Sequence, residues 1–328
     1  KAWVGGVDFK HFKYDAVMQG KRQVGSTFKP FVYAAAIADK KYSPCMEVPN
    51  IQTCIDSGQF GLKEPWCPKN SNDKYGGVLT LKKAIAGSIN TVTTFLMKQI
   101  GPSPVSSMAK SLGITSRVPV VPSIALGTVD LSVYELVGAY TAFGNKGLYT
   151  EPIVILRIED KNGVLLEDFS PSTREVFSPE VAYTVVNLLE GVTESGTGIR
   201  LRHSGGKYRY NVVTDYPYNF TNPIAGKTGT TQNNSDGWFI GMVPNLITGI
   251  WTGCQDRSAH FGITEFGQGA TTALPIWAIL MKDLYTQPKI GISQGGFEKP
   301  KGPMSIALDC DSYLKQSLET DNEQSEYN

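Results

Sequence analysis

The sequence predicts an α/β fold of the α+β kind, in which an antiparallel sheet is packed with helices and a further lobe is all-helical. Strand-like runs lie at 1–9 and, close together, within 224–253, so strands stand near both ends of the chain. The stretches between them are largely helix-forming. A hairpin signal, Asn162-Gly163 between two apolar runs, adds a short antiparallel pair.

The composition indicates a globular protein with a sizeable core. The chain has 328 residues, of which 41% are hydrophobic and 19% charged. The formal net charge of +1 gives no sign of affinity for nucleic acid. No apolar run reaches the length of a membrane span. The first residues, KAWVGGVDF, read as a strand without a proper start, so we expect a fragment that was excised or processed from a longer chain.

The first half of the chain predicts helices interrupted by one irregular segment. A helix is expected over 26–39, where three consecutive alanines allow close packing. Residues 40–78 are rich in Pro, Gly, Asn, Lys and Cys and are predicted to be an irregular insertion. Three further helices are expected: one that begins at Thr80, one over 90–100 and one over about 103–112.

In the second half of the chain, the sequence marks the ends of the predicted helices and strands more clearly. Ser132 and Glu135 form a capping box that begins a helix ending near Gly144. Ser178-Pro179 begins another helix, through about Leu189. A mobile loop is predicted over 193–221, strands over 224–230, 237–243 and 247–253, and a helix over 271–286. We therefore expect one domain over 1–290 and a partly disordered C-terminal tail over 291–328.

The five cysteines do not form a metal-binding pattern. No CxxC pair occurs and the chain has three histidines, so zinc is not expected, and we predict no metal and no other cofactor. Cys45, Cys54 and Cys67 cluster in the insertion, where one disulfide and free thiols are both compatible with the sequence. Cys54 and Cys67 bracket a loop that can close on itself, and Cys45 is the other candidate partner.

The segment GSTFKPFVYAAAI, residues 25–37, places a hydroxyl and an amine one helical turn apart, at Ser26 and Lys29. At a helix start, free N–H groups favour negative charge, so Ser26 can be a nucleophile whose own amide stabilises an oxyanion. An apolar helix beside Lys29 removes solvation, which lowers the lysine pKa and lets the neutral amine accept the serine proton.

The Ser-x-x-Lys spacing alone is weak evidence, because about one chance match is expected in a chain of this length. The matches are Ser26/Lys29, Ser71/Lys74, Ser107/Lys110, Ser204/Lys207 and Ser312/Lys315. Since only the first precedes a long apolar helix, the other four are expected to be structural or surface pairs.

Ser88-Ile89-Asn90 is a second motif, and the only Ser-x-Asn in the chain. It lies at a predicted break between helices. A hydroxyl there can relay a proton, and an amide can hold a lysine or a substrate carbonyl. Ser and Asn also favour such positions as simple caps, so both interpretations stay open.

Lys227-Thr228-Gly229-Thr230 is the third motif, on a predicted edge strand. Lys227 supplies a cation, Thr228 supplies a hydroxyl for a substrate carboxylate, and Gly229 leaves room for a substrate backbone. A chance match to this motif is expected in about one of several hundred such chains.

Together these motifs have the order found in class A β-lactamases and penicillin-binding proteins. Three segments, RQVGSTFKPFVYAAAI, PSIALGTVDLSVYELVGAYTAFGNKG and GKTGTTQNNSDGWFIGMVP, closely resemble the transpeptidase domain of class A (bifunctional) penicillin-binding proteins. The resemblance runs from about Trp3 to Tyr285. The insertion at 40–78 and the acidic tail depart from the family pattern, and we expect both to leave the active site untouched.

The resemblance implies a penicillin-binding protein transpeptidase fold, similar to serine β-lactamases, and a DD-transpeptidase. Such an enzyme cross-links peptidoglycan stem peptides through an acyl-enzyme, here on Ser26, and is also acylated by β-lactams. Lys29 would be the base and work neutral. Ser88 and Asn90 would line the cleft. Lys227, working charged, and Thr228 would bind the terminal carboxylate of the substrate. The amides of Ser26 and Thr230 would form the oxyanion hole.

The resemblance also implies a location and a larger protein. The domain would lie on the outer, periplasmic face of a bacterial cytoplasmic membrane. An upstream glycosyltransferase domain and a membrane anchor would be missing from this segment. Extracytoplasmic residence permits the disulfide considered above.

Other functions remain as alternatives. A serine β-lactamase is disfavoured, because no Glu stands four residues before an Asn, as the class A enzymes require. A DD-carboxypeptidase uses the same serine chemistry with water as acceptor. A non-catalytic penicillin-sensor domain can keep the acylation residues, although the ALGTVDLS block and the Gly-Thr-Gly segment at 196–198 favour the enzymes.

Overall fold

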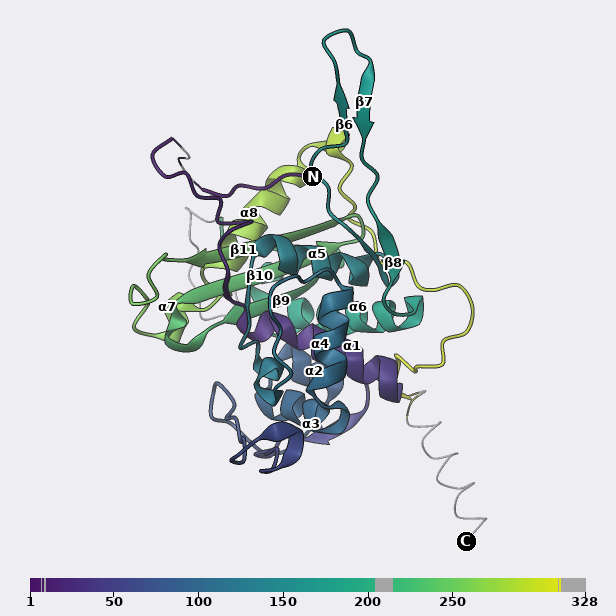
Figure 1. The fold of residues 1–328 in the computed structure, drawn as a ribbon. Coiled ribbons are helices and arrows are strands. Elements are labelled where there is room, and N and C mark those ends of the chain that lie inside the picture. The colour runs from purple at the N-terminus through teal and green to yellow at the C-terminus, as the bar shows by residue number, and fades with distance from the viewer. Residues whose placement is uncertain (7, 9, 204–214, 312, 314–328) are drawn as a thin grey trace.

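The computed structural model (Figure 1) describes residues 1–6, 8, 10–203, 215–311 and 313. The helices are α1 (Lys29–Lys40), α2 (Leu81–Ala86), α3 (Asn90–Ile100), α4 (Pro102–Ser111), α5 (Val133–Gly144), α6 (Pro179–Glu194), α7 (Thr264–Gly267) and α8 (Ala273–Tyr285). The 3₁₀ turns are η1 (Gly25–Phe28), η2 (Gln59–Gly61), η3 (Pro122–Leu126), η4 (Ile199–Leu201), η5 (Gln232–Asn234) and η6 (Pro288–Ile290).

Short strands are found in several places, and the three longest make the main sheet. The strands are β1 (Arg22–Gln23), β2 (Glu47–Pro49), β3 (Val78–Thr80), β4 (Asp130–Leu131), β5 (Leu148–Thr150), β6 (Arg157–Glu159), β7 (Leu165–Asp168), β8 (Thr173–Glu175), β9 (Ala225–Thr230), β10 (Asp236–Val243) and β11 (Leu246–Gly253). The main sheet is antiparallel, in the order β11-β10-β9. The three predicted strands and the edge position of the Lys-Thr-Gly strand, β9, are therefore confirmed.

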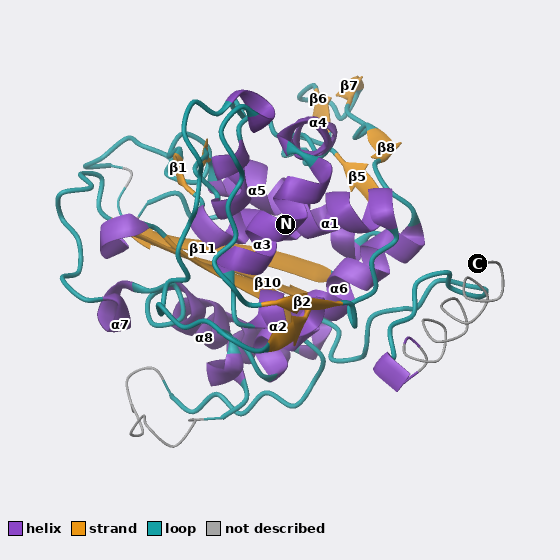
Figure 2. Ribbon diagram, turned by 90° about the horizontal axis from the view of Figure 1, so that it is seen from below, coloured by secondary structure: helices purple, strands orange, loops and turns teal. Residues whose placement is uncertain are grey.

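Strand β10 supplies two hydrophobic cores, because successive side chains of a strand point to opposite faces. Trp238 and Ile240 belong to the larger core, which includes α1, α5 and α6, whereas Phe239 belongs to a smaller core built on α8. Figure 2 shows α5 and α8 on opposite sides of the sheet. Trp277 of α8 lies directly on β10 at Gly241, where a Cβ would come within 2.3 Å of the indole ring.

Helix α1 lies at the centre of the molecule. Every residue from Lys29 to Ile37 is buried, and the helix packs against α3, α4 and α6. The small side chains at 34–36 permit this close packing, while Phe31 and Ile37 each stabilise the fold by about 1.5–3 kcal/mol through burial. The predicted helices of the first half are confirmed, and together they form the helical lobe.

The capping box at Ser132 and Glu135 is present, and its helix, α5, ends at Gly144 as predicted. The helix after Ser178 extends to Glu194, which is five residues beyond its predicted end at Leu189. The hairpin at Asn162-Gly163 is confirmed as β6 and β7. It projects from the body of the molecule (Figure 1).

The strand predicted over 1–9 is wrong for the residues that the structure describes: 1–6 and 8 belong to no strand. This segment instead packs against a turn. The Gly5 carbonyl accepts from the amide of Ala16 at 2.7 Å, and the Trp3 indole donates to Asp15 at 3.0 Å. Asp15 lies so close to Gly5 that a side chain there would collide with it, and this local packing replaces sheet pairing.

The insertion at 40–78 is mostly irregular, as predicted, apart from η2 and β2, which pairs with β3. Cys54 and Cys67 form the disulfide that the sequence suggested. Cys45, the other candidate, instead pairs with Cys310, 265 residues away. The fifth cysteine, Cys254, is free and exposed.

Part of the predicted C-terminal tail lies against the helical body. Besides the Cys45–Cys310 disulfide, the Ser43 hydroxyl donates to the Ala307 carbonyl at 2.6 Å, and Ile306, buried, donates its amide to Glu180 at 2.8 Å. Residues 312 and 314–328 of that tail, and 204–214 of the predicted mobile loop, lie outside the described residues.

Within the described part of the chain, no helix is long and apolar enough to cross a membrane. Among the same residues, no group of three or more His, Cys, Asp or Glu side chains is arranged to hold a metal ion.

Candidate active site

The serine and lysine of the first motif lie on a tight turn at the start of α1. Ser26 is in the 3₁₀ turn η1, and its carbonyl accepts a hydrogen bond from the backbone N–H of Lys29. Side chains three residues apart eclipse in a 3₁₀ turn, so the two side chains share a face. Pro30 follows at a position that suits the first turn of a helix. Ser26 is partly exposed, whereas Lys29 is completely buried.

Two backbone segments hold this turn in place. Gly25 has a φ of +53°, and its amide donates to the carbonyl of Gly127 at 3.1 Å. A Cβ on Gly127 would come within 1.8 Å of the Gly25 carbonyl oxygen, and a Cβ on Gly25 would come within 2.7 Å of the Thr230 carbonyl oxygen. The glycines are therefore required by close approach, which brings the ALGT segment and the end of β9 against the serine turn.

Lys29 points toward the second motif. Its Nζ donates to the carbonyl oxygen of Ser88 at 2.6 Å and to Oδ1 of Asn90 at 2.6 Å, and it lies 3.3 Å from the Ser88 hydroxyl. Ser88 lies in the predicted break, between α2 and α3, with a φ of +55°. A positive φ is strained for serine, and such strain is typical of functional sites. The break itself is confirmed, and the Asn90 amide binds a lysine.

Lys227 reaches the same hydroxyl from the sheet. Its Nζ, also completely buried, donates to Oγ of Ser88 at 3.0 Å and to the carbonyl of Thr228 at 2.9 Å. Burial lowers the pKa of Lys227 to about 7. Burial, and the adjacent charge of Lys227, hold the pKa of Lys29 well below its ordinary value. The Ser88 hydroxyl thus lies between two lysines that are both easily deprotonated.

The edge strand brings in a residue that sequence reasoning did not assign to the site. The hydroxyl of Thr228 lies 2.6 Å from the hydroxyl of Thr197, whose amide donates to the Ala86 carbonyl at 3.0 Å. Thr197 is the middle residue of the Gly-Thr-Gly segment, which was the available signal. Two hydroxyls therefore lie together at the residue that follows Lys227 in β9.

The structure shows a further reason for glycine at position 229, besides the room for a substrate backbone that the sequence suggested. A Cβ at this position would lie 2.8 Å from the Val24 carbonyl oxygen and 2.8 Å from Cγ2 of Thr27. The space beside Gly229 is occupied by the serine turn itself. The glycine therefore lets β9 pack against η1, and this packing places Thr230 next to Gly25.

The structure thus brings the predicted residues of all three motifs together: Ser26, Lys29, Ser88, Asn90, Lys227, Thr228, Gly229 and Thr230. Among the other Ser-x-x-Lys matches, Ser71/Lys74 and Ser107/Lys110 are exposed, as predicted for surface pairs. The remaining two matches, Ser204/Lys207 and Ser312/Lys315, include residues outside the described ranges.

The expectation that the insertion leaves the site untouched is wrong. Nδ2 of Asn90 donates to the carbonyl of Lys69 at 2.7 Å, and the amide of Asn90 donates to Oδ1 of Asn70 at 3.0 Å. The physical reason is that α3 begins after Ile89, which has no side-chain acceptor for the free N–H groups of a helix start. The insertion supplies that acceptor.

Comparison with known proteins agrees with this geometry. A sequence model of the penicillin-binding protein transpeptidase domain matches residues 6–249. Penicillin-binding protein 1A of Neisseria meningitidis serogroup A is 32% identical over 327 residues, which cover 98% of this chain and 38% of that protein. Penicillin-binding protein 1A of Aquifex aeolicus is 32% identical over 287 residues, which cover 86% of this chain and 36% of that protein.

Solved structures show the same fold. Penicillin-binding protein 1A from Haemophilus influenzae superposes with a TM-score of 0.73 at 24% identity, over 92% of this chain and 46% of the other. PonA1 from Mycobacterium tuberculosis, solved in complex with penicillin V, superposes with a TM-score of 0.71 at 23% identity, over 93% of this chain and 78% of the other. The chain spans well under half the length of the curated relatives that it matches. By the matched domain and these relatives, the chain belongs to the penicillin-binding protein transpeptidase family, of the class A kind.

Proposed function

We propose that this domain is a serine-type D-Ala-D-Ala transpeptidase, which forms an acyl-enzyme on Ser26 and is also acylated by β-lactams. One observation carries the proposal beyond family membership: the two short hydrogen bonds that Lys29 makes to the Ser88 carbonyl and to Oδ1 of Asn90, each 2.6 Å. They explain how a lysine acts as a base beside the serine.

A neutral amine has two N–H bonds and one lone pair. A backbone carbonyl and an amide oxygen can only accept hydrogen bonds, so these two partners take both N–H bonds of neutral Lys29. The lone pair is then left for a hydroxyl proton. Burial keeps the pKa of Lys29 well below its ordinary value, so the neutral form is available. Lys29 is therefore the base that takes the proton of Ser26.

In the acylation step, a bond to Ser26 replaces the peptide bond to the terminal D-Ala. Oγ of Ser26 bonds to the carbonyl carbon of the penultimate D-Ala, and its proton goes to Lys29. The C–N bond to the terminal D-Ala breaks, and the leaving nitrogen takes a proton through the hydroxyl of Ser88, which lies between Lys29 and Lys227. The nitrogen of an acceptor amine then bonds to the same carbonyl carbon, the ester C–O bond to Ser26 breaks, and the proton that the amine loses returns to Oγ of Ser26 through Lys29.

Substrate recognition is assigned to the edge strand. The terminal carboxylate binds at Lys227 and the paired hydroxyls of Thr228 and Thr197. Although burial lowers the pKa of Lys227 to about 7, an adjacent carboxylate favours its charged form. The amides of Ser26 and Thr230 stabilise the developing oxyanion, because β9 packs against η1 through Gly229.

The setting of the domain follows from the resemblance and from the greater length of the relatives. We place the domain on the periplasmic face of the cytoplasmic membrane, in a longer chain with a glycosyltransferase domain and a membrane anchor upstream. Two disulfides within one chain suit an oxidising compartment.

The test is turnover of a stem peptide that ends in D-Ala-D-Ala, with and without an amine acceptor. The expected products are the cross-linked peptide and one free D-Ala, with no product from Ser26→Ala. Ser107→Ala, which alters the exposed serine of another Ser-x-x-Lys pair, is the matched control and retains activity. Hydrolysis without transfer identifies a DD-carboxypeptidase. Acylation without any turnover identifies a penicillin-sensor domain.

A further inference from the structure

Helix α3 begins with a cap that comes from a distant segment. Its first free N–H groups, on Asn90 and Thr91, donate to Oδ1 of Asn70 at 3.0 and 3.1 Å. Asn70 belongs to the insertion and is 4% exposed. A side-chain oxygen at a helix start normally comes from the residue just before the helix, and here that residue is Ile89.

The same segment determines which end of the Asn90 side chain faces the base. Nδ2 of Asn90 donates to the carbonyl of Lys69 at 2.7 Å, while Oδ1 accepts from Lys29 at 2.6 Å. A backbone carbonyl cannot donate, so the Lys69 carbonyl requires the nitrogen end of the amide. The oxygen end is thereby directed to Lys29.

We propose that Asn70, together with the carbonyl of Lys69, positions Asn90 so that the lone pair of Lys29 is free for the acylation step. This inference rests on the proposed function, since it concerns the base of that reaction. If the amide reversed, Nδ2 would face Lys29 and donate to the amine nitrogen, which would occupy the lone pair. Asn70 is thus a positioning residue, and it acts through Asn90.

Asn70 is itself firmly anchored. Its Nδ2 donates to Oδ1 of Asn50 at 2.9 Å and to the carbonyl of Lys74 at 2.9 Å. The same Asn50 oxygen accepts from the hydroxyl of Thr91 at 2.9 Å. Each polar atom of the buried Asn70 amide is therefore used, and a buried network that is fully satisfied is rigid.

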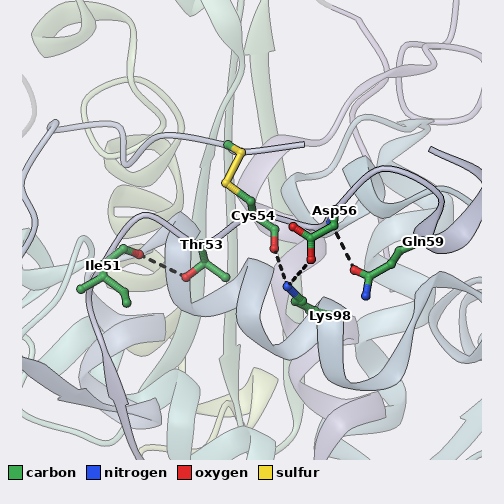
Figure 3. Close-up of a disulfide and its surroundings, with 7 residues drawn as sticks. Ile51, Thr53, Cys54, Asp56, Gln59 and Lys98 are labelled. Carbon is green, nitrogen blue, oxygen red and sulfur yellow. Dashed lines mark hydrogen bonds and ion pairs between the residues drawn. A yellow bond between two sulfur atoms is a disulfide. The ribbon is translucent and has the colours of Figure 1, made fainter. Parts of the chain in front are cut away.

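The insertion also holds the other end of α3 (Figure 3). Lys98, in the last turn, donates to the carbonyl of Cys54 at 3.0 Å and to the carboxylate of Asp56 at 2.9 Å. Cys54 is bonded to Cys67, which precedes Lys69 by two residues. The disulfide loop is therefore attached to one end of the helix, and the residues that follow it are attached to the other.

The experiment compares Asn70→Ala with Asn72→Ala in the 328-residue chain. Asn72 is the same residue type in the same segment, is exposed, and accepts from the amide of Lys74 without contacting Asn90. Acylation by one β-lactam is separated into the non-covalent dissociation constant and the acylation rate constant. We expect Asn70→Ala to lower the rate constant about tenfold to a hundredfold through misplacement of the base, with the dissociation constant changed less than about twofold. Asn72→Ala should match wild type.

Two further variants distinguish positioning from general loosening of the fold. Asn70→Asp keeps oxygen acceptors for the amides of Asn90 and Thr91 but loses the N–H donors to Asn50 and Lys74, so it should acylate faster than Asn70→Ala and more slowly than wild type. In an Asn90→Ala background, Asn70→Ala should change the rate constant by less than about twofold, because the residue through which it acts is gone.

Four outcomes decide the matter. Equal rate constants for Asn70→Ala and wild type would overturn the inference, as would an undiminished effect of Asn70→Ala in the Asn90→Ala background. Should Asn70→Ala fail to fold, Asn70→Asp decides through the same comparison: a folded variant whose loss of rate is undiminished in the Asn90→Ala background contradicts the inference. Absence of acylation in wild type counts against the proposed function instead, so the two failures are distinguishable.

Discussion

The hydroxyl of Ser88 accepts a 3.0 Å hydrogen bond from Nζ of Lys227, an amine that belongs to the sheet while Ser88 belongs to the helical lobe. Lys29 reaches the same hydroxyl from a third element, α1. Burial and mutual repulsion make it unfavourable for both of these neighbouring amines to be protonated at the same time. We therefore assign the neutral state to Lys29, which has two oxygen acceptors at 2.6 Å, and the charged state to Lys227.

The first prediction separates the two lysines by exchange for arginine, which stays protonated in proteins yet binds carboxylates well. Lys29→Arg should lower the acylation rate of Ser26 by about a hundredfold or more, because a general base must have a free lone pair. Lys227→Arg should retain a measurable fraction of the rate. The measurement is the second-order acylation rate with one β-lactam at neutral pH, after circular dichroism has established that both variants fold. Acylation of Lys29→Arg as fast as Lys227→Arg would rule out Lys29 as the base.

A second prediction concerns pH and the carboxylate site. Because the pKa of Lys227 is about 7 in the free domain, its charged form predominates below pH 7 and is lost as the pH rises. The non-covalent affinity for a β-lactam carboxylate should therefore fall above pH 7, by up to about tenfold per pH unit. Lys227→Arg should remove this dependence, since arginine does not titrate there. An affinity for wild type that is flat between pH 6 and pH 9 would contradict a charge role for Lys227.

The third prediction uses the strained backbone of Ser88, whose φ is +55°. Ser88→Ala and Ser88→Gly both remove the hydroxyl, so both should acylate about a hundredfold more slowly if that hydroxyl relays the proton. Glycine tolerates positive φ, so Ser88→Gly should be more stable than Ser88→Ala by roughly 0.5–1 kcal/mol in the free energy of unfolding. Chemical denaturation gives that comparison. A wild-type acylation rate in Ser88→Ala would eliminate the relay.

The fourth prediction counts thiols. With Cys45–Cys310 and Cys54–Cys67 bonded, protein made in an oxidising compartment should show one reactive thiol per chain, Cys254, under denaturing, non-reducing conditions. Cys254→Ser should then show none. Closing the loop between Cys54 and Cys67 should add about 3 kcal/mol in the chain-entropy model. Five free thiols would refute both bonds.

The features that could be predicted from sequence were those encoded within a few residues. Ser26 and Lys29 lie one turn apart, so their shared face follows from helical geometry alone. The capping box of Ser132 and Glu135 is likewise a pattern within one turn. The strand and helix positions follow from local periodicity and from turn residues, and the order of the three motifs led to the family.

The features that could not be predicted depend on contacts between irregular segments. Asn70 caps a helix that begins 20 residues later, and no periodic pattern marks such a contact. Thr197 meets Thr228 across 31 residues, and Cys45 meets Cys310 across 265. The strand predicted over 1–9 was wrong for its described residues, because apolar residues at Trp3 and Val4 suit a strand but no neighbouring strand pairs with them there.

The central claim is that Ser26 is the acylated nucleophile, and the most direct test is the intact mass of the protein after incubation with benzylpenicillin. We expect a gain of one penicillin per chain, with the adduct on the peptide that contains Ser26. Ser26→Ala should carry no adduct, and the exposed control Ser107→Ala should carry the normal one. No stable adduct on wild type, or an adduct on a serine other than Ser26, would contradict this claim.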